Sequence, residues 1–266
     1  MNELFERFLG KGRKSPTETP EPILPYPIRD HLRYNTQLPK ELVLSFVRNG
    51  SSEREGFENT ALYLVLKASA NDPELEKILL HELADILQSD TDESDAGHAA
   101  RIRAFIESAI ARIPGDWTVD ARNLGRISRH GFRLTDERYR AHASTLAQDP
   151  RDVFILGHAT FVGLASFIRA FKKAGKRLHI VIPAFVDTDP DSVVPLHTRN
   201  HTAGYVIDPD GSVRDLRADD LRGSAGKVVI DDARRTGKTE GLVRTYFEAF
   251  GVHDMSFEPM LDASLG

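Results

Sequence analysis

Cysteine is absent from the 266-residue sequence, and several other features that define functional classes are scarce. Without cysteine, the chain has no disulfide bond, no thiol nucleophile and no thiolate ligand for zinc. The longest uninterrupted apolar run, residues 61–66, is far shorter than the roughly 20 residues of a membrane-spanning helix. The first residues are charged and lack the apolar core of a signal peptide, so we expect a cytoplasmic protein without a membrane partner.

An excess of basic residues is also missing. The 35 Lys and Arg residues are outnumbered by 40 Asp and Glu residues, which gives a net charge of −5. This balance offers no overall attraction to polyanions, and we therefore expect no nucleic-acid partner. A content of 40% hydrophobic and 28% charged residues is typical of globular proteins, and the length suits one large domain or two small ones.

The first half of the chain divides into a proline-rich segment and a helical region. Five prolines between residues 13 and 27 exclude a helix or a central strand there, so residues 1–29 are predicted to be an extended lead-in. Residues 30–115 are predicted to be helical, because apolar residues recur at helical spacing in two stripes. The stripes consist of Leu75, Leu79, Leu83 and Ile86, and of Ile102, Phe105, Ile106, Ala109, Ile110 and Ile113.

Residues 116–266 have the alternating pattern of an α/β domain with a mainly parallel sheet. Short apolar runs at 152–157, 177–185 and 227–232 predict buried strands, and helical stripes follow the first and the third run. Residues 205–216 predict a β-hairpin, because Asp-Pro-Asp-Gly lies between two short runs. Residues 252–257 predict a last strand.

The segment VVIDDARRTGKTEGLV, residues 228–243, carries the clearest chemistry. A buried strand ends in Asp231 and Asp232, and a short loop with Thr236 and Gly237 then leads into a helix. Loop N–H groups and the positive end of the helix dipole favour a bound phosphate. The two carboxylates are placed to accept hydrogen bonds from a diol, directly or through a divalent cation. A phosphorylated sugar satisfies both halves of this arrangement.

This segment resembles the phosphoribosyl pyrophosphate (PRPP) motif of the type I phosphoribosyltransferases. That motif has an apolar strand, two acids, a three-residue spacer and Thr-Gly-x-Thr, and residues 228–239 match it. The surrounding order is similar too, since the family places a strand, a pyrophosphate loop, a helix, a second strand and a flap before the motif. The resemblance covers roughly residues 120–258. It implies a parallel sheet flanked by helices and a magnesium-dependent transferase (glycosyltransferase class) of nucleotide metabolism.

The resemblance also implies roles for individual residues. Asp231 and Asp232 would contact the ribose hydroxyls, with Mg²⁺ held mainly by PRPP and these two acids nearby. The 5′-phosphate would bind to Arg235, Thr236, Gly237, Lys238 and Thr239. Pyrophosphate would bind to Gly157, His158, Ala159 and Thr160, and the flap candidates are Arg199, His201 and Arg214. The reaction would be displacement of pyrophosphate from the anomeric carbon by a nitrogenous, nucleobase-like acceptor. A homodimer is compatible with this assignment.

Some residues depart from the family pattern and keep alternatives open. Purine-salvage members have an Asp where this chain has Arg235, and the loop 157–160 lacks the family's basic residue and paired glycines. The altered loop favours a second interpretation, a non-catalytic PRPP- or nucleotide-sensing protein. A third is a helical adaptor that binds no PRPP. A nucleoside-triphosphate P-loop is excluded because Asp232 stands where its first glycine is required. The helical region is either a hood that selects the acceptor or an interaction module.

Overall fold

The computed structural model describes the residues that form the helices, the strands and their short connections. They are residues 28, 31, 34–35, 37–49, 57–69, 72–87, 95–121, 136–156, 163–181, 204–222, 226–234 and 238–262. The strands are β1 (Gln37–Pro39), β2 (Thr118–Asp120), β3 (Asp152–Leu156), β4 (Leu178–Val181), β5 (Gly204–Ile207), β6 (Val213–Asp215), β7 (Lys227–Arg234) and β8 (Met255–Asp262). The helices are α3 (Lys40–Asn49), α4 (Phe57–Ser69), α5 (Pro73–Ile86), α6 (Asp95–Arg112), α8 (Asp136–Leu146), α9 (Leu164–Lys173), α10 (Ala218–Arg222) and α11 (Lys238–Glu248).

Six of the described strands form one sheet in the order β6-β5-β4-β3-β7-β8. In this order, β4, β3, β7 and β8 run parallel to one another. Strand β5 is antiparallel to β4, and β6 is antiparallel to β5. The predicted α/β architecture is therefore confirmed, and the sheet is mixed because the hairpin 204–215 adds two antiparallel strands at one edge. The short, charged β6 is a poor template for further pairing, and Pro259 lacks an N–H in β8 at the other edge.

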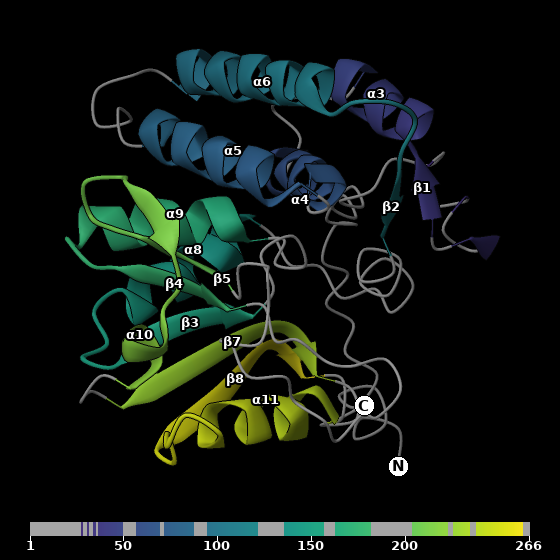
Figure 1. Cartoon of the computed structure of the whole chain (residues 1–266). Coiled ribbons are helices and arrows are strands. Elements are labelled where there is room, and N and C mark those ends of the chain that lie inside the picture. Colours follow the sequence, from purple (N-terminus) through teal and green to yellow (C-terminus); the bar gives the residue numbers. More distant parts are fainter. Residues whose placement is uncertain are drawn as a thin grey trace, which may run out of the picture.

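Helices cover both faces of this sheet (Figure 1). On one face, alternate residues of the strands pack in a single cluster with α8, α9 and the helices α3 to α6. On the other face, Phe154, Val181 and Val229 pack against α10 and α11. Parallel strands need this cover because both of their faces are apolar. In the third predicted strand, Val228, Val229 and Ile230 are all buried, as the continuous apolar run predicts.

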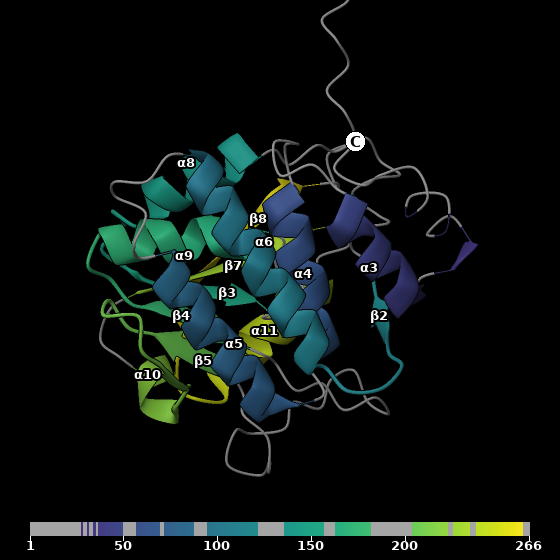
Figure 2. The same cartoon turned by 90° about the horizontal axis from the view of Figure 1, so that it is seen from above.

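The N-terminal helices lie in a layer across the sheet, as the view from above shows (Figure 2). Helix α4 is the central one, since residues Thr60 to Leu66 are all buried. Its neighbours bury the two predicted stripes, with Leu79 and Leu83 of α5 and Ile106 of α6 fully covered. Strand β1 pairs with β2, so the two ends of this helical layer meet.

Local sequence signals explain where α5 begins. Asp72 caps the helix by accepting a hydrogen bond from the backbone N–H of Leu75 at 3.1 Å, and Pro73 occupies the first helical position. Helix α9 ends with Lys172 and Lys173 before Gly175, as its sequence predicts.

None of the described helices combines the length and the apolar character that a membrane crossing requires. The division into residues 1–29, 30–115 and 116–266 stays a prediction.

Ion pairs join the strands at the amino edge of the sheet, where the parallel strands begin. The Lys227 ammonium is 1% exposed and lies 2.6 Å from a carboxylate oxygen of Asp152 on the neighbouring strand. The Arg151 guanidinium forms a bidentate pair with Asp149 and also contacts Glu258 of β8 at 3.3 Å. These contacts hold β3, β7 and β8 in register at one end of the sheet.

The pair between Arg151 and Asp149 predicts acid sensitivity. Hydrogen bonds from Arg151 lower the pKa of Asp149 from its ordinary value of 3.8 to about 2. Because the folded pKa is the lower one, the pair's stabilisation is complete above about pH 4 and is lost as the pH falls toward 2. We expect Asp149→Asn to reduce the slope of unfolding free energy against pH in this window, as measured by urea denaturation. Equal slopes for the variant and the wild type would contradict this assignment.

Candidate functional site

The connections that leave β3 and β7 run in opposite directions along the sheet. After β3 the chain passes through α9 to β4 on one side, and after β7 it passes through α11 to β8 on the other. Helices α9 and α11 lie on opposite faces of the sheet. In open α/β sheets, ligands bind beyond the carboxyl ends of the strands at such a switch point. The carboxyl ends of β3 and β7 are therefore the candidate site.

Asp231 lies at this point. Ile155 of β3 pairs with Ile230 of β7, and β7 then continues for four residues beside β8, beginning with Asp231 opposite Pro259. Asp231 is half-buried and is two residues beyond Val229, so it lies on the face that α11 covers. A carboxylate is thus held on β7 just beyond the end of the neighbouring strand β3. The predicted buried strand does lead into this acid, but the strand does not end at the two acids as predicted: β7 continues through Asp231 and Asp232 to Arg234, because it pairs with β8 along this stretch.

The other residues of the predicted motif are described in part or not at all. Asp232 belongs to β7 by its backbone, Lys238 begins α11, and Thr239 is exposed in the first turn of that helix. The remaining members lie outside the described residues: Arg235, Thr236, Gly237, Gly157, His158, Ala159, Thr160, Arg199 and His201. Their roles stay predictions.

Two helices begin beside the candidate site, one on each face. Helix α9 starts at Leu164, eight residues after β3 ends at Leu156, and α11 starts at Lys238, four residues after β7 ends at Arg234. The N-terminal N–H groups and the dipole of a helix favour negative charge. Gly163 precedes α9 and offers no side chain to cap it. The arrangement suits an anionic ligand.

Close packing fixes the start of α9. A Cβ atom at Gly163 would lie 1.9 Å from Cδ1 of the Tyr139 ring in α8, so only glycine fits there. Tyr139 is itself 1% exposed, and the close packing of protein interiors opposes a shift of its ring. The sequence pattern did not identify this contact, because a single glycine in a loop carries no information about a tyrosine 24 positions away.

A second glycine fixes the start of β5. Gly204 pairs with Val181, the last described residue of β4, and has φ of 150°. A Cβ atom there would lie 1.9 Å from the carbonyl oxygen of Ile180. The strands β4 and β5 can therefore approach each other only with glycine at this position. The carbonyl oxygen of Gly204 accepts a hydrogen bond from the Leu216 N–H at 2.9 Å. Both ends of the hairpin therefore lie at the side of the sheet where β4 ends.

Tyr205 follows directly and reaches the helical layer. Its hydroxyl donates a hydrogen bond to Oε2 of Glu76 in α5 at 2.8 Å, and both side chains are buried. Burial, together with the Glu76 carboxylate, raises the pKa of Tyr205 far above its ordinary value, so its hydroxyl stays protonated at neutral pH. Sequence reasoning missed this pair, since a glutamate inside an amphipathic helix ordinarily faces solvent.

Arg214, a flap candidate in the sequence, has a different environment. Its guanidinium donates two hydrogen bonds of 2.8 Å to Asp220 and lies 3.3 Å from Asp208. Hydrogen bonds from Arg214 in turn lower the pKa of Asp220. These two carboxylates engage the guanidinium, so a structural role in joining β6 to α10 explains Arg214 better than contact with a leaving group.

The described residues contain no group of three potential metal ligands. At the candidate site the described donor is the single carboxylate of Asp231. Mg²⁺ commonly binds one or two carboxylates together with substrate phosphates instead of a complete protein cage. The donor chemistry at Asp231 therefore fits a cation that arrives with a phosphorylated ligand.

Comparisons of the chain with protein-family models, with curated proteins and with solved structures found no match.

The contact between Gly163 and Tyr139 predicts opposite effects for two glycine substitutions. Gly163→Ala forces a methyl group into the Tyr139 ring, so we expect a loss of about 1–3 kcal/mol of unfolding free energy. Gly241→Ala is the matched control, because a Cβ atom there meets nothing within 4 Å in helix α11. That variant should gain about 0.4–1 kcal/mol. Chemical denaturation measures both, and equal stability of the two variants would contradict the assigned packing.

Proposed function

We propose that this protein binds PRPP at the carboxyl ends of β3 and β7 and transfers its phosphoribosyl group to a nitrogenous acceptor, with release of pyrophosphate. The observation that carries the proposal is the coincidence of the motif with the topology. The two acids of the PRPP-type motif lie in the part of the central strand β7 that extends past β3, at the point where the strand order switches direction.

The order of elements supports a type I phosphoribosyltransferase-like fold as the finer description. Strand β3, helix α9, strand β4, the hairpin β5–β6 and strand β7 follow one another as the family's strand, helix, second strand, flap and motif strand do. The parallel pairing of β3 with β7 puts the end of β3, which precedes the predicted pyrophosphate loop in the sequence, beside the strand that carries the predicted ribose acids. The departures at Arg235 and in residues 157–160 make a 6-oxopurine acceptor a poor candidate.

The proposed chemistry is a displacement at the anomeric carbon of the ribose. The lone pair of an acceptor nitrogen forms the new bond to that carbon, and the bond to the pyrophosphate oxygen breaks with its electron pair. Positive charge develops on the ribose ring in the transition state, and the Asp231 carboxylate nearby is of the right sign to stabilise it. We infer that the pyrophosphate leaves on the side of the N-terminus of α9, because the dipole of a helix favours an anion there.

Mg²⁺, when bound with PRPP, would supply charge neutralisation on the pyrophosphate. Asp231 and Asp232 are the residues of this chain that would stand near it. Their own part is to accept hydrogen bonds from the ribose hydroxyls and so to hold the sugar in line with the incoming acceptor.

The test is a calorimetric titration of PRPP and Mg²⁺ into the wild type and into Asp231→Asn. We expect the wild type to bind and the variant to lose at least tenfold in affinity, because the amide cannot accept two hydrogen bonds from the diol through charged oxygens. Asp219→Asn is the control, since its carboxylate is 93% exposed on α10 and it is no part of the predicted motif. Absence of binding to the wild type would refute the transferase and leave the helical adaptor.

The altered loop 157–160 keeps a non-catalytic PRPP sensor as the second candidate. The two functions share the binding site and differ in turnover. A screen of nitrogenous acceptors for pyrophosphate release separates them: release that requires Asp231 identifies a transferase, whereas Asp231-dependent binding without release from any acceptor identifies a sensor.

A further inference from the structure

His179 is a histidine buried on the face of the sheet that α10 and α11 cover. It lies in β4, is 5% exposed, and pairs with Phe154 of β3 on one side and with Val206 of β5 on the other. Its ring stacks on that of Phe154, with the ring centroids 4.6 Å apart. Phe154 and Val206 pack in one cluster with Leu221 of α10, and paired residues share a face of a sheet, so α10 lies over His179.

The hydrogen bonding of His179 suits its neutral form. Nδ1 lies 3.2 Å from the carbonyl oxygen of Val153, and it must donate there because a carbonyl oxygen only accepts. In the neutral ring, Nε2 then carries no proton. Protonation adds an N–H at Nε2, and none of the described residues accepts a hydrogen bond from that atom. A protonated His179 therefore combines a buried charge with an unmade hydrogen bond, and both are costly.

The charged residues at the amino end of these strands balance one another. Three carboxylates and three cations form pairs with N–O distances of 2.6 to 2.8 Å: Asp152 with Lys227, Asp208 with Arg177, and Asp220 of α10 with Arg214 of β6. The other charged residues of α10, Asp219 and Arg222, lie 3.7 Å apart at the surface. Because every carboxylate of this group already has a cationic partner, a proton on His179 gives the group a net positive charge.

The pKa of His179 agrees with this geometry. Burial lowers it below the ordinary value of 6.5, although Asp152, the Val153 carbonyl and Asp220 act in the opposite direction. If α10 separates from the sheet, water reaches the ring and its pKa returns toward the ordinary value. Because the pKa is lower in the packed form, the packing of α10 is fully stabilised above about pH 6.5 and weakens as the pH falls from there toward that lower pKa.

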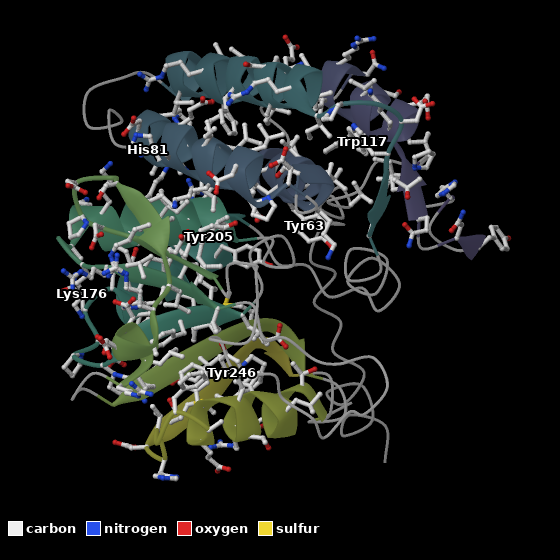
Figure 3. The ribbon with its side chains drawn as sticks, viewed as in Figure 1. Tyr63, His81, Trp117, Lys176, Tyr205 and Tyr246 are labelled. Atoms are coloured by element: carbon white, nitrogen blue, oxygen red, sulfur yellow. The ribbon has the colours of Figure 1, made fainter. Side chains whose placement is uncertain are left out.

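Of the two helices on this face, α10 is held by less apolar surface. It spans five residues, and Leu221 is its fully buried apolar side chain. Helix α11 spans eleven residues and buries Tyr246 and Phe247 against the strands, as Figure 3 shows for Tyr246. The Phe154 ring, which stacks on His179, also meets Phe247 edge-on at 5.2 Å, so it lies between His179 and α11. Separation of α10 therefore exposes His179 with a smaller loss of buried apolar area than separation of α11.

We propose that His179 is a pH-sensitive switch for α10, which stays packed on the sheet while the imidazole is neutral and separates more readily when the imidazole takes up a proton. Leu221 and the pair of Asp220 with Arg214 set how rarely α10 separates at pH 7, whereas His179 sets how that equilibrium changes with pH. This inference is independent of the proposed function, because it concerns the amino end of the sheet.

Hydrogen exchange of the α10 amides, measured from about pH 7 to about pH 4.5 and expressed as protection relative to an unstructured chain, tests the switch. In the wild type we expect this protection to fall as the pH drops below 6.5, by at most about tenfold per pH unit, because one proton is taken up. The amides of α9 on the opposite face should keep their protection. His179→Asn retains an N–H donor for the Val153 carbonyl but does not titrate, so its α10 protection should not change over this range.

His253→Asn is the matched control, since it removes an exposed histidine just before β8 and should behave as the wild type. If His179→Asn does not fold, as judged by circular dichroism, His179→Phe keeps a ring against Phe154 and provides the same test. Constant α10 protection in the wild type, or a folded His179 variant that keeps the pH dependence, overturns the inference. Equal losses of protection in α9 and α10 also overturn it, because they indicate unfolding of the whole sheet. None of these outcomes bears on PRPP binding.

Discussion

The parallel pairing of β3 with β7 is the contact on which the rest of the molecule depends. Each strand is followed by a helix that returns to the amino edge, and the two helices lie on opposite faces of the sheet. The carboxyl ends of the two strands therefore meet where no crossover passes above them. This geometry brings the end of β3 and Asp231 together, although they are separated by the whole of α9, β4 and the hairpin.

The amino and carboxyl ends of the parallel strands differ in what they contain. At the amino edge, Lys227 with Asp152 and Arg151 with Asp149 and Glu258 join neighbouring strands by charge. A buried ammonium such as that of Lys227 is tolerated because its carboxylate partner lies 2.6 Å away. With the strands held at this end, β7 and β8 extend past β3 at the other end, and Asp231 lies just beyond the last residue of β3 that pairs with β7.

The helical layer is part of the same buried core as one face of the sheet, which fixes its position over that face. Its stripes of leucine and isoleucine account for the helices but leave their partner undetermined, because an apolar stripe packs against any apolar surface. The partner is set by single residues of specific shape and polarity. Glu76 of α5 accepts a hydrogen bond from the Tyr205 hydroxyl of β5, which joins the layer to the hairpin.

The sequence by itself determined the helical stripes, the three buried strands, the hairpin and the register of two acids with Thr-Gly-x-Thr, because each is a property of residues within one helix turn or one strand. It could not determine that β7 lies beside β3, that Gly163 meets Tyr139, or that Tyr205 bonds to a residue 129 positions away. Those contacts depend on how separate elements pack, and periodicity carries no information about distant partners. Tertiary structure alone turned a local motif into a candidate site at a defined edge of a sheet.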